Sequence, residues 1–538
     1  MKSIGLNSTN PRFSAERKWR TGMQTKHLFT AALAGLMLAG LTTTATAESP
    51  KMKMTTPIPK EITTPDKVKT SIGTLRFKNG MPDKATIDKA YDYIDLARAV
   101  NVFMDTQSGV SMWGFRNGMR AAGVPDHTLM TMEQMTDSTG MYLTPNTVTP
   151  QTYTFLNLKD GPVVMEVPPG VLGPANDMWF RYICDIGIAG PDEGKGGKYL
   201  FLPPGYKGEV PKAGYFVFES PTHGVWAPFR NFAVEGDVKP AIESMLKHTR
   251  IYPLSEAGKP HGPLPNKNAS MMEINTIQPN TYKYWLDLNE LVQEEGAKQM
   301  GPEIAGNIAA IGIEQGKPFN PDARMKRILT EAAAIGNATA RAVLWAPRNE
   351  EAYFYGKEHA WFNGFQGGYQ FQLEDGVRNI DGRTTFFYLA TGITPAMEAK
   401  MVGKGSQYAV AAKDIDGNWL DGSKNYKLTL PANIPQENFW SFTNYDTQTR
   451  SMQQTDYKFP AIGAGKGFPA DGSPNGAVQQ NGDGTTDVYF GPEAPKGLES
   501  NWIQTAPGRG WFTIFRLYSP LEPWFDKTWR PGEIKLVK

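Results

Sequence analysis

The spacing of apolar side chains changes along the chain, and each change marks a new kind of secondary structure. From Ala85 the spacing is helical, with apolar residues three or four positions apart on one face: Tyr93, Leu96, Val100 and Phe103. Asp83 or Thr86 stands where it can cap this helix. Beyond Thr144 the apolar runs become short and are separated by Pro-Gly turns, which is typical of β-strands. Such runs are Val163–Val167, Tyr199–Leu202 and Tyr215–Glu219.

The middle of the chain returns to helical spacing. One predicted helix ends at Gly296 and has a single apolar face formed by Trp285, Leu288 and Val292. A second helix has a recognisable start, with Asn320 as the cap, Pro321 in the first turn and Asp322 beside the helix dipole. We expect it to continue through the alanine-rich residues 332–342, which suit close packing against a neighbour.

From about Gly403 onward the pattern is again that of strands separated by Gly and Asp turns. Alternate positions of one predicted strand are Thr486, Val488 and Phe490. In another, one face carries Phe512, Ile514 and Arg516, and the opposite face carries Phe515 and Leu517. Several short strands at this spacing predict a sandwich or jelly roll.

These patterns predict a mixed, β-rich fold in five consecutive parts. Residues 1–47 form a signal peptide, 48–80 an extended arm, and 81–275 an N-terminal antiparallel β domain with flanking helices. Residues 276–400 form a helical connector, and 401–538 form a C-terminal jelly-roll-like β-sandwich.

The N-terminal residues have the pattern of a secretory signal. Lys26 precedes an apolar run of 14 residues, Leu28–Leu41, and residues 45–47 read Ala-Thr-Ala before Glu48. The run is shorter than the ~20 residues that span a bilayer. We therefore expect cleavage after residue 47, with Met23 as an alternative start of translation. The mature protein is predicted to be periplasmic or extracellular, with no transmembrane segment.

Composition narrows the classes of function. The chain has 56 Lys and Arg against 54 Asp and Glu. Without the six basic residues and one Glu of residues 1–47, 50 basic and 53 acidic residues remain, which gives no electrostatic basis for nucleic-acid binding.

A single cysteine, Cys184, excludes a disulfide scaffold, and no two histidines have metal-ligand spacing. The acidic residues 414–418 suit a hairpin turn better than a calcium loop. We predict no metal and no cofactor.

One stretch, residues 220–230, combines three kinds of side chain that a ligand site needs. His223 is a titratable base, Trp226 a stacking surface and Arg230 a cation, all close to a predicted strand. The alternative is an Arg stacked on a Trp to close a loop. If the protein is a hydrolase, Asp177 and His223 are the candidate catalytic residues, whereas Trp226 and Arg230 are the candidate ligand-binding residues.

Longer motifs resemble a known family of exported bacterial proteins. In the first half they are residues 158–168 (LKDGPVVMEVP), 177–179 (DMW), 198–200 (KYL), 203–206 (PPGY) and 221–222 (PT), with Trp226 and Arg230. In the second half they are residues 439–446 (FWSFTNYD), Asn481, 483–484 (DG), 501–502 (NW), 516–518 (RLY) and Trp529. Between them lie residues 311–313 (IGI) and 316–319 (GKPF). The chain thus resembles proteins that pair two domains of unknown function, twelve-fifty-four and twelve-fourteen.

The resemblance implies a β-rich first domain, a helical connector and a jelly-roll-like second domain, but no settled reaction. Many members have Asn-x-Asp-Thr where this chain has residues 146–149, with Val148 in place of Asp. A role of that carboxylate cannot be carried over. Two functions stay open: binding of a small polar, aromatic or sugar-like ligand, or hydrolysis of a small ester or glycoside. The sequence leaves the oligomeric state open.

Overall fold

The computed structural model describes residues 56–232, 237–466, 468 and 476–538. Backbone contacts divide the chain into residues 1–64 and residues 65–538. In the first of these units, the described part contains a 3-10 turn, η1 (Lys60–Ile62). The predicted signal peptide lies outside the described residues.

The N-terminal strands form two sheets that share one core. One has four strands in the order β10-β9-β6-β12, and the other has six in the order β13-β4-β5-β11-β7-β8. Their bounds are β4 (Leu129–Thr131), β5 (Gln151–Asn157), β6 (Val163–Val167), β7 (Leu172–Asp177), β8 (Tyr182–Gly187), β9 (Gly197–Leu202), β10 (Phe216–Glu219), β11 (Gly224–Arg230), β12 (Arg250–Pro253) and β13 (Asn266–Asn268). Met165, Ile186 and Ala227 are fully buried in the shared core. The sheets therefore form a sandwich.

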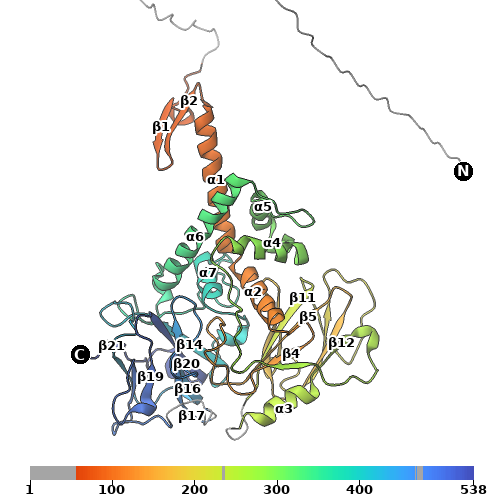
Figure 1. The fold of residues 1–538 in the computed structure, drawn as a ribbon, viewed down its shortest axis with the longest axis vertical. Helices are drawn as coiled ribbons and strands as arrows, with labels where there is room; N and C mark the ends of the chain where they lie inside the picture. The colour runs from red at the N-terminus through yellow and green to blue at the C-terminus, as the bar shows by residue number, and fades with distance from the viewer. Residues whose placement is uncertain (1–55, 233–236, 467, 469–475) are drawn as a thin grey trace, which may run out of the picture. The chain divides into compact units, whose positions relative to one another are not determined.

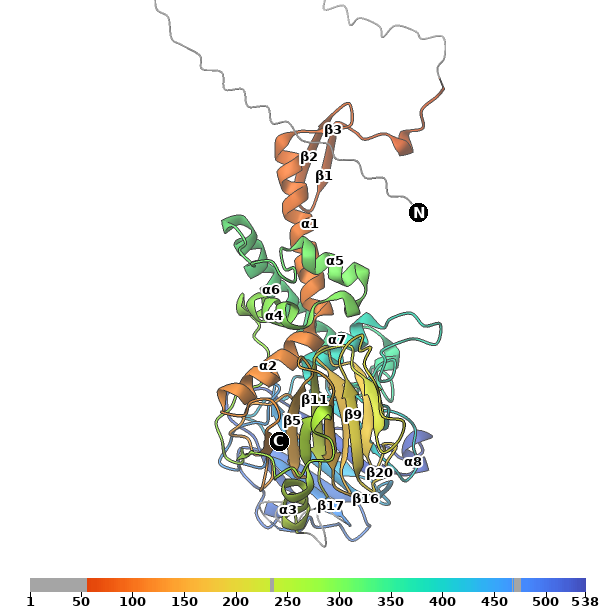
Figure 2. The same ribbon diagram turned by 90° about the vertical axis from the view of Figure 1, so that its right-hand side faces the viewer.

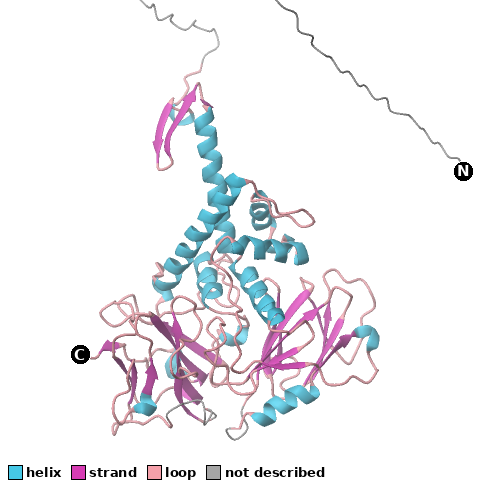
Figure 3. Ribbon diagram, in the orientation of Figure 1, coloured by secondary structure: helices cyan, strands magenta, loops and turns pink. Residues whose placement is uncertain are grey.

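The C-terminal strands form a second sandwich. Its sheets have the orders β14-β20-β16-β17 and β19-β18-β15-β21. Their bounds are β14 (Ser406–Ala411), β15 (Tyr426–Leu430), β16 (Gln436–Asp446), β17 (Ala461–Gly465), β18 (Thr486–Gly491), β19 (Trp502–Gln504), β20 (Trp511–Pro520) and β21 (Lys535–Leu536). Leu428, Phe442 and Val488 come from both sheets and are buried in one core. The predicted β-rich fold with a C-terminal β-sandwich is confirmed, and Figure 3 shows the strands of the two sandwiches as two separate groups.

Most of the helices lie on one side of the two sandwiches (Figures 1 and 2). The α-helices are α1 (Lys84–Asp105), α2 (Gln107–Ala121), α3 (Lys239–His248), α4 (Lys283–Glu295), α5 (Pro302–Ala310), α6 (Ala323–Trp345), α7 (Ile380–Leu389) and α8 (Glu522–Phe525). The 3-10 turns of this unit are η2 (Leu254–Glu256), η3 (Lys298–Met300), η4 (Glu350–Ala352), η5 (Pro395–Met397) and η6 (Glu499–Asn501). Among the described helices, none combines the length and the apolar character that a membrane span requires.

Small residues allow α1 and α6 to pack closely. A Cβ atom added at Gly336 would come within 2.4 Å of the Phe103 ring, so the helices touch where glycine leaves room. Gly336 therefore does not interrupt the alanine-rich helix, which runs unbroken to Trp345. Substitution of Gly336 would force the two helices apart.

The structure refines three details of the predicted elements. Helix α6 is capped by Asp322, whose carboxylate accepts the Met325 amide at 2.7 Å, and not by Asn320 as predicted. A cap must accept from a backbone amide two or three residues ahead, and Asp322 satisfies this geometry. Tyr93 is 53% exposed, so the packed face of α1 begins at Leu96. Part of the predicted arm is not extended but forms strands β1 (Lys67–Thr70) and β2 (Gly73–Lys78), which make a three-stranded sheet with β3 (Met81–Pro82).

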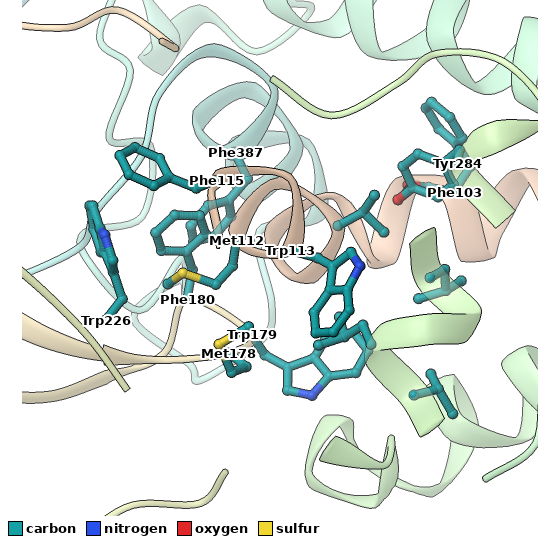
Figure 4. Packing of buried hydrophobic residues seen from close by; sticks show 14 of the residues in the cluster. Phe103, Met112, Trp113, Phe115, Met178, Trp179, Phe180, Trp226, Tyr284 and Phe387 are labelled. Carbon is teal, nitrogen blue, oxygen red and sulfur yellow. The ribbon is translucent and has the colours of Figure 1, made fainter. Parts of the chain in front are cut away.

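An aromatic cluster fixes the six-stranded sheet against the helices. Trp226 of β11 packs between Phe115 of α2, at 5.2 Å between ring centroids, and Phe180, at 5.5 Å. Figure 4 shows these three rings together with Phe387 of α7. Tyr153 of β5 stacks on Trp226 with an angle of 10° between the ring planes. The indole of Trp226 therefore has little freedom to move.

Candidate functional site

A cavity of about 150 Å³ lies between the two sandwiches. Strands β5, β11, β7 and β8 of the six-stranded sheet contribute one wall, and β14 and β20 contribute another. The segment that follows α7 lines the cavity as well, including Thr391, Gly392 and Thr394. The site is thus assembled from both β-rich halves of the chain and from the connector between them.

The alternation of side chains along β11 determines what this strand presents to the cavity. Ala227 and Phe229 point into the core of the N-terminal sandwich. Trp226, Pro228 and Arg230 occupy the other face and line the cavity. A cation is thereby placed on an otherwise apolar stretch of sheet.

The facing wall is built by the same alternation. In β14 and β20, Ala409 and Phe515 point into the C-terminal core. Tyr408 and Arg516 lie directly opposite each other in the antiparallel register of these two strands, on the face that lines the cavity. Two arginines, one from each sandwich, therefore face the same small space.

The hydrogen bonds of these arginines go to neutral oxygens. Arg230 Nη2 donates to Tyr408 Oη at 3.2 Å. Arg516 Nη2 donates to Tyr445 Oη at 2.7 Å and to the Thr144 carbonyl at 3.5 Å. Arg516 is 3% exposed, and its buried Nη1 has no hydrogen-bond partner in the described part of the chain. Among the described residues, no carboxylate forms an ion pair with either arginine.

The backbone at Thr144 is held in a conformation that non-glycine residues rarely adopt, with a φ of 38°. Its amide donates to the Arg450 carbonyl at 2.8 Å, and its hydroxyl donates to the Leu389 carbonyl at 3.1 Å. These contacts hold the Thr144 carbonyl beside Arg516. Local strain of this kind is maintained by the surrounding structure and is common at ligand sites.

Protonation in the cavity is set by burial and by the proximity of phenols to guanidinium groups. Burial alone would lower the pKa of Arg230, but the oxygens of Tyr408 and Tyr518 raise it above its ordinary value. Burial also opposes the charge of Arg516, whose pKa the neighbouring phenols raise. For Tyr408, burial raises the pKa, but Arg230 and then Arg516 lower it to a net value below that of an ordinary tyrosine. Both arginines therefore stay cationic.

Asp185 of β8 lines another part of the cavity. Its carboxylate accepts hydrogen bonds from the Thr394 hydroxyl at 2.6 Å and from the Tyr182 hydroxyl at 3.1 Å. Burial raises the pKa of Asp185, and these two hydroxyl groups only partly offset that effect. The carboxylate thus has its own partners, and it forms no ion pair with Arg230 or Arg516.

The structure brings together two of the four residues proposed from the sequence. Trp226 and Arg230 line the cavity, whereas Asp177 and His223 do not. The Asp177 carboxylate is fully buried, is ion-paired with Arg181 at 2.7 Å and accepts the Trp179 amide at 2.9 Å. These bonds stabilise the turn between β7 and β8.

His223 lies before the opposite end of β11 from Arg230. Its amide donates to the Glu295 carboxylate at 2.6 Å, and the next amide, of Gly224, donates to the same group at 2.8 Å. Glu295 therefore anchors the start of β11 to α4. The geometry gives Asp177 and His223 no shared ligand space in this cavity.

Sequence reasoning missed Tyr408 and Arg516 as site residues. A signal for Arg516 was present, because it stands on one strand face with Phe512 and Ile514. An arginine on an apolar strand face needs a specific environment, since a buried charge must be compensated. Nothing comparable distinguishes Tyr408, because tyrosine is common in half-buried strands.

Val148, the position at which this chain departs from the motif of the proteins it resembles, is completely buried. It packs with Phe439, Ala461 and Tyr518. Tyr518 is one of the phenols that interact with both arginines, and its hydroxyl accepts a hydrogen bond from the Asn146 side chain at 2.7 Å. Valine therefore contributes no charge to this side of the arginine cluster.

Fold and site together define a protein of two β-sandwiches with an arginine-lined cavity between them. Two family models match it: Protein of unknown function (DUF1254) over residues 127–253, and Protein of unknown function (DUF1214) over residues 405–522. The chain carries both modules, in the order that its motifs predicted. Arg230 belongs to the first module and Arg516 to the second.

Two solved structures are similar to this chain. The VPA0106 protein from Vibrio parahaemolyticus is 20% identical, with a TM-score of 0.49 over 82% of this chain and 100% of that chain. An uncharacterised protein from Burkholderia cenocepacia is 9% identical, with a TM-score of 0.35 over 85% of this chain and 90% of that chain. A comparison with curated proteins found no match.

Proposed function

We propose that the cavity between the sandwiches binds a small anionic molecule. The observation that carries this proposal is that Arg230 and Arg516 face one cavity without a carboxylate partner among the described residues. Arg516 is buried, and a buried charge without a partner costs roughly several kcal/mol, so proteins normally pair it. A bound anion would supply the missing charge.

The donors present suit an oxygen anion. Guanidinium groups bind carboxylate and phosphate oxygens through short, charge-assisted hydrogen bonds. The Tyr408 hydroxyl accepts the bond from Arg230 and can turn its own hydrogen toward a bound anion. Because apolar side chains surround this group, its electrostatic interactions are stronger than they would be in water.

Thermal unfolding in the presence of small anions tests the proposal. A ligand that binds only the folded protein raises the unfolding temperature with its concentration. We expect sodium salts of acetate, benzoate or phosphate to raise it more than sodium chloride of equal ionic strength. If none of the three exceeds chloride at any concentration, the anion site does not exist.

Ionisation of Tyr408 gives the anion site a predicted pH dependence. Arg230, Arg516, Tyr445 and Tyr518 face this phenol, and the two guanidinium groups lower its pKa. Burial raises the pKa of Tyr518 to about 12, so that phenol stays protonated over the same range. As the pH rises through the lowered pKa of Tyr408, a phenolate forms and competes with the ligand for the arginines.

Benzoate affinity should therefore fall as the pH approaches 10, the ordinary tyrosine value. The Tyr408→Phe variant should lose most of this alkaline decline, because it cannot form a phenolate. Calorimetric titrations of both proteins between pH 7 and pH 10 measure the difference. Parallel declines in the two proteins would assign the pH effect to another group.

We also propose that the protein works outside the cytoplasm. The support is the signal-like pattern of residues 1–47, which ends at Ala47. The protein recovered from the exported fraction of its host should begin at Glu48, as N-terminal sequencing would show. Recovery of the chain in the cytoplasm with residues 1–47 attached would contradict export.

A further inference from the structure

We propose that the ligand is a monocarboxylate with a single ring-sized apolar body, similar to benzoate in size and polarity. This inference rests on the proposed anion site and names the class of molecule that would fill it. It depends on three features of the cavity: its apolar walls, its volume and the position of its charges.

Apart from the arginines, the walls of the cavity are mainly apolar. The contributing side chains come from β11, α7, β14, β20 and the loop before α7: Trp226, Phe365, Phe386, Leu389, Val410 and Ile514. A hydroxyl group packed against these six side chains would lose its hydrogen bonds to water without replacing them. An apolar body gains free energy at the same surfaces.

The volume limits the body to about one ring. At about 150 Å³ the cavity is of the size that holds one benzene molecule in an apolar protein interior. The cavity has little means to expand at Trp226, because Phe115, Phe180 and Tyr153 pack against that indole (Figure 4 shows the first two).

The charges of the cavity orient the ligand and limit it to one anionic end. Arg230 and Arg516 come together where β11 faces β14 and β20. Asp185 lies on β8, and strand β7 separates it from β11. A second anionic group placed near Asp185 would meet a carboxylate instead of a cation. We therefore expect the carboxylate of the ligand at the arginines and its apolar body along the remaining walls.

Calorimetric titration of the mature protein with four probes tests the ligand class. Benzoate should bind at one site per chain and at least about tenfold more tightly than acetate, which lacks the ring. It should also bind at least about tenfold more tightly than benzamide, which has the ring but no charge. Phosphate should bind more weakly than benzoate, because it leaves the apolar walls uncovered.

The outcomes separate this inference from the proposed function. If acetate or phosphate binds as tightly as benzoate, the anion site stands and the ring-sized body is wrong. If benzamide binds as tightly as benzoate, the apolar space binds ligands, but the role proposed for the arginines is wrong. If none of the four binds, both proposals fail.

A substitution that fills the apolar space provides a second measurement. A Cβ atom added at Gly364 would have one neighbour within 4 Å, Cδ2 of Leu389 at 3.9 Å, so the backbone there can accept a side chain. Gly364→Leu should weaken benzoate at least about tenfold while acetate affinity stays within about threefold. The matched control is Gly306→Leu on α5, a site with nothing within 4 Å, which should leave both affinities unchanged. Unchanged benzoate affinity in Gly364→Leu would contradict the assigned body position.

Discussion

The Arg516→Met variant should bind benzoate at least about tenfold more weakly than the parent protein, yet unfold at nearly the same temperature. A hydrogen bond to a charged group contributes roughly 1.5–3 kcal/mol, which corresponds to a loss of about tenfold to 100-fold in affinity. Stability should change little, because the substitution has two opposing effects. It removes a buried charge that has no carboxylate partner in the described chain, and it also removes the hydrogen bond from Arg516 to Tyr445. Calorimetry and thermal unfolding on the same samples measure the two effects.

Arg230→Met should behave in the same way, and His223→Gln is the matched control. His223 precedes the same strand, β11, but does not line the cavity. Its side chain should therefore contribute nothing to benzoate affinity. Parent-like binding by both arginine variants would show that the cations serve the fold alone, whereas loss of binding in His223→Gln would move the site toward Glu295.

Arg116→Met should have the opposite profile, with a large loss of stability. Arg116 of α2 is completely buried, and it pairs with Asp126 at 2.6 Å and with Glu294 at 2.8 Å. Removing one partner of a buried ion pair costs about 3–5 kcal/mol, because the remaining charges stay buried. The expected value is near the lower end, since Arg120 and Lys159 also contact these carboxylates.

The control for this effect is Arg120→Met. Arg120 contacts Asp126 at 3.0 Å from a side chain that is 35% exposed. An ion pair of that exposure contributes about 1 kcal/mol or less. The midpoint of the first urea unfolding transition should shift clearly for Arg116→Met and little for Arg120→Met. Equal shifts would mean that burial does not govern the strength of this network.

The strands and helices could be predicted because each carries its own local signal. Strand β6 has the predicted bounds, Val163–Val167, since an apolar run between proline-rich turns admits few alternatives. Helix α4 ends before Gly296, which adopts a φ of 73° that glycine tolerates. The cap of α6 was misplaced because Asn320 and Asp322 are both good caps, and only the folded backbone selects between them.

Two of the residues that line the cavity could be predicted to lie together, because they are close in the sequence. Trp226 and Arg230 share one strand, so the alternation of β11 places them on one face. Arg516 reaches the same cavity only because the two sandwiches pack together. No local sequence pattern indicates which sheets of the two sandwiches face each other. The ion pair of Asp177 with Arg181 could not be predicted for a similar reason, because it depends on the turn between β7 and β8.

A crystal structure of the protein grown with 4-bromobenzoate tests directly whether the arginine-lined cavity binds a carboxylate. Anomalous scattering locates the bromine independently of the protein density. We predict one strong bromine peak in the cavity on the side of Trp226 and Leu389, with the carboxylate contacting Arg230 and Arg516. A well-diffracting crystal that shows the cavity without bromine, or bromine only at the protein surface, would contradict the account.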